Sequence, residues 1–274
     1  MRRVQGIATT THVDLHGEAM TLSALEDFVR QVREGYIPVG VEHDIRNPPI
    51  GRIVSGEVVR LPDGEHGLLV TEELYESTDT ASGLAGDGRR MVTSCREIQG
   101  LAVMYDRTFD SEAGRTLLAN LASLTDGQEP PRPYLKKALE PSPTLLISAG
   151  MFLLGAVASG FLSRVGADAY DSLKAALRRY LSTEKPSERI FDFCIYVRAP
   201  NSEMEVHILL TNPSPDELAA ALDGSLASMD ELLAQLPVDE VDIARVVYQA
   251  GTDGPHLLYT VRGDAVPGQL RPRT

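Results

Sequence analysis

The residues whose types could take part in catalysis or metal binding lie in the first 43 positions. They are three histidines and an aspartate: His12, Asp14, His16 and His43. Imidazole and carboxylate groups are zinc ligands. His12 and His16 are four residues apart, which suits a helix, but the residues around Asp14 are typical of a turn. The HExxH arrangement is absent. The glycines between 83 and 88 follow no strand and lack a P-loop lysine. We therefore expect no metal and no cofactor.

The elements that must position these residues form a mostly-β region over residues 1–128. Apolar residues recur at helical spacing from Thr21 to Glu34, and Ser23 with Glu26 resembles a capping box before the terminal Gly35. Strand-like patterns cover Val4–Thr10, Pro38–Glu42, Ile50–Arg60, Gly67–Leu74 and Gly100–Tyr105. One helix among several strands predicts an α+β domain.

Several short motifs follow one another in order between Val13 and Val70. They are Asp14 with Gly17 and Glu18, the helix, His43-Asp44, Pro49-Ile50-Gly51-Arg52, and Gly67-Leu68 before a strand. Their order and spacing resemble the tailed-phage prohead protease family, whose fold is of the herpesvirus-assemblin type. The resemblance is confined to the N-terminal domain, for which it implies an assemblin-like fold and serine endopeptidase ancestry.

The resemblance implies that His43 is the catalytic base. A neutral imidazole takes the proton of a serine nucleophile, and Glu42 and Asp44 beside it can orient the ring. The best match to the family's serine strand is Arg96–Met104, which places Ala102 at the nucleophile position. Alanine has no nucleophile, so the resemblance implies a degenerate protease. The alternatives are Ser94 as the nucleophile of an active enzyme, or a structural His43 that caps a turn and an ordinary polar Ser94.

The middle of the chain begins with a proline-rich stretch, 129–143, which favours an extended linker. The next 19 residues, Thr144–Leu162, contain no charged side chain, and this length matches a membrane span. They predict a central hydrophobic helix, continued to residue 184 by an amphipathic stretch. Gly155, Ser159 and Ser163 recur at four-residue spacing, which permits close contact between helices and predicts a homo-oligomer. The alternative is a buried or oligomerising helix outside a membrane.

The last segment, 185–274, predicts a small ββαββ domain. Its strands are expected at Ile190–Arg198, Met204–Thr211, Ile243–Ala250 and His256–Arg262, with a helix over Ser214–Leu236. His207 and His256 lie on strands, where we interpret them as structural. The two cysteines, Cys95 and Cys194, form no disulfide framework.

Composition narrows the class of partner. The chain has 274 residues, with 26 Lys and Arg against 39 Asp and Glu, giving a formal net charge of −13. Phosphate neutralisation needs a basic surface, so nucleic acid is not an expected partner. The N-terminus has no apolar segment of the kind that a secretory signal requires. The expected location is the bacterial inner membrane with cytoplasmic domains, or the cytoplasm.

These observations predict a degenerate prohead-protease-like module that binds or senses a peptide or protein ligand. A groove that receives an extended peptide can still bind one by strand addition after its nucleophile is lost. A phage-like module next to a membrane-type helix also associates the chain with bacterial defence or stress. The alternatives are an active serine endopeptidase that uses His43 and Ser94, and a membrane-embedded structural oligomer.

Overall fold

The structure is a computed structural model that describes residues 1–13, 19–41, 44–76, 87–93, 101–106, 109, 111–124, 131–133, 144–153, 167–183, 189–199, 202–234, 236, 242–251 and 254–268. The chain divides into two compact units, which are described separately. Unit 1 consists of Met1–Val92 and Tyr259–Thr274, and unit 2 of Thr93–Leu258. The fold is mixed α+β, as the sequence predicts, with two sheets.

Unit 1 contains a five-stranded sheet in the order β1-β4-β3-β2-β5. Its strands are β1 (Arg2–Thr10), β2 (Gly35–Val39), β3 (Gly51–Arg60), β4 (His66–Leu74) and β5 (Arg90–Met91). The β3–β4 hairpin turns through Gly64, whose φ of 95° lies in the left-handed region that glycine adopts without strain. Strand β1 is at one end of the order, so one of its edges is paired with β4 alone.

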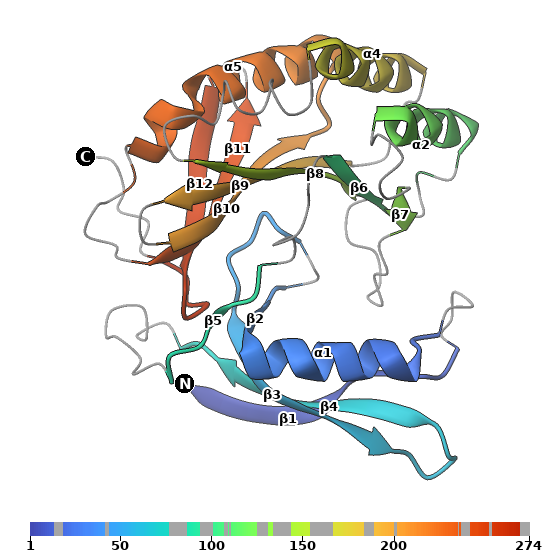
Figure 1. Cartoon of the computed structure of the whole chain (residues 1–274), viewed down its shortest axis with the longest axis vertical. Helices are drawn as coiled ribbons and strands as arrows, with labels where there is room; N and C mark the ends of the chain where they lie inside the picture. Colours follow the sequence, from blue (N-terminus) through green and yellow to red (C-terminus); the bar gives the residue numbers. More distant parts are fainter. Residues whose placement is uncertain are drawn as a thin grey trace. The chain divides into compact units, whose positions relative to one another are not determined.

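Helix α1 (Leu22–Glu34) lies along one face of this sheet (Figure 1). Thr21 is its N-cap and accepts a hydrogen bond from the backbone N–H of Ala24 at 3.1 Å, so the helix begins two residues before the predicted capping box. The buried side of α1 packs with β3 and β4 in an apolar cluster: Leu25, Val29, Val32, Ile53, Leu68 and Val70. At Gly35, where the helix ends, a Cβ would lie 2.2 Å from the carbonyl oxygen of Arg90, so the close approach of β5 requires glycine.

A buried arginine links the sheet of unit 1 to the C-terminal segment of the same unit. Arg52 of β3 donates to Glu73 at 2.9 Å and to the carbonyl oxygen of Asp264 at 2.7 Å, and its guanidinium lies over the Tyr36 ring. Tyr75 donates to the carbonyl oxygen of Ala265 at 2.8 Å. The buried Arg52 guanidinium and the Tyr75 side chain together hold residues 263–266 against strands that lie about two hundred positions earlier in the sequence.

Unit 2 is built on a seven-stranded sheet in the order β12-β11-β10-β9-β8-β6-β7. The strands are β6 (Leu101–Tyr105), β7 (Arg132–Pro133), β8 (Thr144–Leu153), β9 (Ile190–Ala199), β10 (Ser202–Thr211), β11 (Ile243–Gly251) and β12 (Gly254–Arg262). Strands β9 and β10 are antiparallel, whereas β8 is parallel to β9 and β10 is parallel to β11. Strand β12 crosses the boundary between the units, which falls after Leu258.

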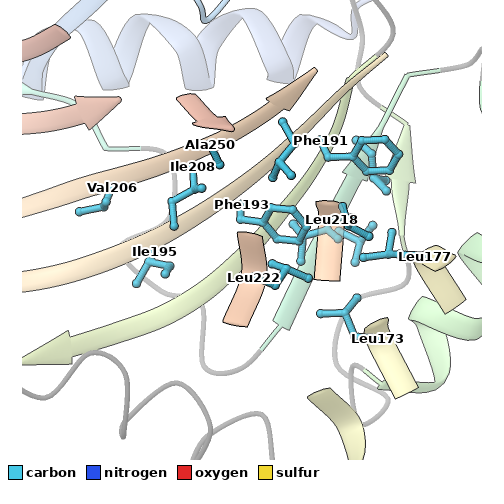
Figure 2. Packing of buried hydrophobic residues seen from close by; sticks show 14 of the residues in the cluster. Leu173, Leu177, Phe191, Phe193, Ile195, Val206, Ile208, Leu218, Leu222 and Ala250 are labelled. Atoms are coloured by element: carbon cyan, nitrogen blue, oxygen red, sulfur yellow. The ribbon is translucent and has the colours of Figure 1, made fainter. Parts of the chain in front are cut away.

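Three helices cover one face of this sheet: α2 (Glu112–Leu124), α4 (Ala167–Thr183) and α5 (Pro215–Ala234) (Figure 1). Figure 2 shows how apolar side chains of the strands meet the helices in the main core, among them Phe191, Phe193, Ile195, Leu173, Leu177, Leu218 and Leu222. Because side chains alternate across a strand, the odd-numbered residues of β9 face this core and the even-numbered ones face away from it.

The predicted central hydrophobic helix is wrong in its first ten residues. Thr144–Leu153 is strand β8, which lies between β6 and β9 in the interior of the sheet. A strand buried on both faces is apolar throughout, so it lacks the alternation that marks a half-buried strand. Residues 154–166, which include the predicted small-residue stripe, lie outside the described residues. Within the described part of the chain, no helix has the length and apolar character needed to cross a membrane.

The predicted ββαββ order of the last segment is present as β9, β10, α5, β11 and β12. The amphipathic stretch after residue 166 is helix α4, with Tyr170, Leu173 and Leu177 buried. Met204–Thr211 is an interior strand, since β10 pairs on both sides. Helix α2 has no counterpart in the sequence-based prediction. Neither has the two-residue strand β7, which lies inside the predicted linker.

Candidate functional site

The residues predicted to carry protease chemistry do not form a site among the residues that the structure describes. His43 and Ser94 lie outside the described residues. Ala102 lies on β6, opposite Ser148 of β8. Strand β2, which precedes His43, pairs with β3 and β5, whereas β6 pairs with β8 and β7. The strand before His43 and the strand that carries Ala102 therefore belong to different sheets and do not pair with each other.

The N-terminal histidines are the residues that were considered as zinc ligands and for which no metal was expected. His12 is near the surface, with its Nε2 2.6 Å from Oδ2 of Asp63 and its Nδ1 3.1 Å from Oγ1 of Thr10. The hydrogen bond from His12 holds the pKa of Asp63 below its usual range. Asp14 and His16 lie outside the described residues. Among the residues that the structure describes, no group of three or more His, Cys, Asp and Glu side chains is arranged to hold a metal ion.

The strongest cluster of reactive side chains lies on the sheet of unit 2, on the face opposite the helices. Asp192 and Cys194 are neighbours on this face of β9, Glu205 and His207 on β10, and Arg245 on β11. The strand register pairs His207 with Cys194 and Glu205 with Arg245. All but Arg245 are among the buried residues of the chain.

His207 is the centre of this cluster. Its Nδ1 lies 3.0 Å from Oδ1 of Asp192, and its Nε2 lies 3.7 Å from Sγ of Cys194 and 3.5 Å from Oε2 of Glu205. Burial disfavours the imidazolium ion, but the charge and hydrogen bond of Asp192 outweigh burial and raise the pKa of His207 well above its usual value. His207 is therefore a cation between two carboxylates.

Glu205 is fully buried and is held ionised by two cations. Arg245 donates from Nε to Oε2 of Glu205 at 2.8 Å. Burial opposes ionisation, yet the charges and hydrogen bonds of Arg245 and His207 lower the pKa of Glu205 to about 2. Asp192, Glu205, His207 and Arg245 thus form two carboxylates and two cations whose charges cancel.

The cysteine, histidine and aspartate have the connectivity of a cysteine-nucleophile triad but not its chemistry. Burial raises the pKa of the Cys194 thiol, whereas the nucleophile of such enzymes needs a lowered pKa and solvent access. The imidazole faces Glu205 as well as Cys194, so its Nε2 proton is shared with a carboxylate. The arrangement is a neutral buried network, in agreement with the structural interpretation of His207.

A second candidate site is a pocket at the carboxyl ends of β10 and β11. It has a volume of about 590 Å³ and lies where β10 ends at Leu210 and Thr211 and β11 ends at Ala250 and Gly251. Strands β10 and β11 are parallel and are connected through α5. Ligands of α/β sheets bind outside the carboxyl ends of parallel strands, and a volume of several hundred Å³ is that of a ligand site.

The pocket exists because small side chains surround it. Ala220 and Ala221 of α5 line it together with Gly254 and Pro255 at the start of β12. Most of its described lining residues are alanine, proline, leucine or glycine, so it favours an apolar group.

Both charged side chains in the described lining, Asp216 and Glu217, are acidic. They belong to the first turn of α5, where Glu217 and Ser214 form a capping box: Ser214 N–H donates to Oε2 of Glu217 at 2.8 Å, and Glu217 N–H donates to Oγ of Ser214 at 3.2 Å. These hydrogen bonds lower the pKa of Glu217, so the carboxylate is charged at neutral pH. Asp216 is exposed and has a long ion pair, 3.4 Å, with Arg178. The rim of the pocket is therefore acidic over an apolar floor.

The sequence contained a signal for the buried network that the prediction did not use. In β9 and β10 polar residues alternate with apolar ones, as Phe-Asp-Phe-Cys-Ile and Glu-Val-His-Ile. The pocket has no comparable signal, because it depends on β10 and β11 being parallel neighbours. Comparison of the chain with family models, with curated proteins and with solved structures found no match. The resemblance to prohead proteases remains a prediction.

Proposed function

We propose that this chain is a binding or sensing module for a peptide or protein segment, and that the pocket between α5 and the carboxyl ends of β10 and β11 receives that segment. The pocket of about 590 Å³ carries the proposal. Its size fits one or two side chains of an extended segment. Its composition favours a segment that presents an apolar side chain next to a basic one, because the floor is apolar and Asp216 and Glu217 are acidic.

The chemistry of the Cys194 thiol supports binding rather than catalysis. Cys194 is buried and its thiol pKa is raised, so it does not offer a substrate an activated sulfur. The described lining of the pocket contains no cysteine, serine or histidine side chain, which suits a recognition module. The pocket lies in unit 2, so this proposal does not depend on the resemblance of the N-terminal region to prohead proteases.

Selection of peptides tests the proposal. Phage-displayed random dodecapeptides are selected on the full chain, and the affinities of enriched peptides are measured by calorimetry. Ala220→Phe fills the pocket from the exposed side of α5, and we expect it to weaken binding at least about tenfold. Ala119→Phe on α2 is the matched control, because Ala119 is also an exposed helical alanine but lies outside the pocket lining.

Charge-neutral variants separate the acidic rim from the apolar floor. Glu217→Gln retains the capping box, since glutamine also fills that position, and Asp216→Asn retains the shape. We expect each to weaken basic peptides about threefold, as expected for exposed charge pairs, while Glu231→Gln near the other end of α5 has no effect. Selected peptides that bind Ala220→Phe as tightly as the parent would exclude the pocket.

A further inference from the structure

Strand β1 leaves one long edge of the unit 1 sheet without a partner among the described strands. It has nine residues, pairs with β4 on one side only, and is the end strand of the sheet. Arg2, Arg3 and the four residues from Gln5 to Ala8 are exposed. The exposed N–H and C=O groups of such an edge form a template for a further strand.

This edge lacks most of the features that protect exposed strands. Short length, charged side chains and proline normally prevent edge pairing. Strand β1 is nine residues long and has no lysine or proline, and its charged side chains are Arg2 and Arg3 at its start. Its pairing with β4 is regular up to Ile7, and a register shift follows before Thr9. Ile7 is 45% exposed, which places an apolar side chain on the open strand.

The charge of β1 is compatible with a second copy as the partner. The chain has a net charge of −13, so most encounters between two copies are repulsive. Strand β1 contains no acidic residue, and Arg3, one of its two arginines, is paired with Glu73 of β4. The strand itself therefore adds no negative charge to the repulsion between two copies.

From these observations we infer that β1 pairs antiparallel with β1 of a second copy, about a two-fold axis at Gly6. This register places Arg2 opposite Thr10 and Arg3 opposite Thr9, so no like charges face each other. It places Ile7 opposite Gln5, and Gly6 opposite its own equivalent. An isologous contact of this kind closes as a dimer with a continuous ten-stranded sheet.

Engineered cysteines test both the contact and its register. A Cβ at Gly6 meets no atom within 4 Å, so Gly6→Cys is accommodated on the open strand. Directly opposite Cβ atoms on antiparallel strands are about 4.5–5.5 Å apart, close enough for a disulfide after a small adjustment. Gly40→Cys is the matched control, because a Cβ there also has open space but Gly40 lies outside β1.

The experiment uses the full chain with Cys95→Ser, which removes the other native cysteine. Cys194 is left in place because it is buried. We expect oxidised glutathione to convert Gly6→Cys to a covalent dimer at least about tenfold faster than Gly40→Cys. Analytical ultracentrifugation of the parent is expected to show a reversible dimer, weakened at least about tenfold by Ile7→Lys. Ile50→Lys, at an equally exposed site, is expected to leave it unchanged.

The outcomes are decisive in both directions. A dimer that depends on Ile7 and crosslinks through Gly6→Cys supports the inference, and thermal unfolding of Ile7→Lys establishes that the variant is folded. A monomeric parent overturns it, and so does a dimer that ignores Ile7→Lys or crosslinks no faster at Gly6→Cys than at Gly40→Cys.

Discussion

His207 and Cys194 lie directly opposite each other on β10 and β9, with Nε2 of the imidazole 3.7 Å from Sγ of the thiol. The pair is enclosed in the sheet, and Asp192 holds the other nitrogen of the ring. The cation on His207 is neutralised by carboxylates instead of by a thiolate. The same three residue types that activate a nucleophile in other proteins here stabilise a sheet.

The first prediction concerns the reactivity of Cys194. In a Cys95→Ser background, we expect iodoacetamide to modify Cys194 at least about a hundredfold more slowly in the native chain than in urea, because the thiol must be exposed by opening of the sheet. Mass spectrometry over time measures both rates. Rapid modification of the native chain with an apparent thiol pKa below 7 would contradict the buried network and indicate an activated nucleophile.

The second prediction compares a buried ion pair with an exposed one. Arg245→Met leaves the fully buried carboxylate of Glu205 without its nearest cation, and we expect a loss of about 3 kcal/mol in the free energy of unfolding. Arg198→Met removes the partner of Glu203, whose side chains are 56% and 35% exposed, and should cost less than about 1 kcal/mol. Urea denaturation measures both, and equal losses would contradict the assigned role of Glu205.

The third prediction is the acid sensitivity of the network. The folded pKa of Glu205, about 2, lies below its reference value of 4.5, so its contribution to stability is complete above pH 4.5 and is lost as the pH falls towards 2. The raised pKa of His207 acts in the other direction: its contribution is complete below 6.5 and is lost only as the pH rises through the folded value. Within this network, Glu205 and not His207 therefore contributes to the slope below pH 4.5.

Glu205→Gln should flatten this acid slope. Between pH 4.5 and 2, we expect the variant to lose on the order of 3 kcal/mol less stability than the parent, measured by urea denaturation at each pH. Glu203→Gln, which removes an exposed carboxylate from the same strand, is the control and should follow the parent. An unchanged slope in Glu205→Gln would show that Glu205 is not held ionised by its neighbours.

The fourth prediction concerns serine chemistry. Ala102 lies on β6 and pairs with Ser148, in a different sheet from the strand before His43. We therefore expect Ala102→Ser to gain no reaction with a fluorophosphonate probe. Gel fluorescence of the parent, Ala102→Ser and Ser94→Ala measures this, and labelling that disappears in Ser94→Ala would establish a serine hydrolase instead.

Local sequence patterns predicted most elements whose two faces differ in environment. Helix α1 and strands β3, β4, β9 and β10 have clear periodicity, because each has one face in a core or follows a turn of defined chemistry. Strand β8 was mistaken for a helix because it is apolar on both faces, so its composition shows length but no period. Proline density likewise concealed β7, whose two residues pair with β6.

The candidate site was less predictable, since it depends on which strands become neighbours. The pocket needs Ala250 of β11 beside Leu210 of β10, and that proximity follows from their parallel pairing and not from either local sequence. Glu205 and Arg245 are 40 positions apart and meet for the same reason. His207 was visible on a predicted strand two residues after Glu205, but its contacts with Asp192 and Cys194 were set by register.

The discontinuous composition of unit 1 has a consequence during protein synthesis. Unit 1 begins with the first residue but needs Asp264 and Ala265, whose carbonyl oxygens receive Arg52 and Tyr75. Unit 2 is encoded between these two parts. A ribosome therefore releases the whole of unit 2 before unit 1 can close, so the part of the chain that emerges first is the last to reach its native contacts.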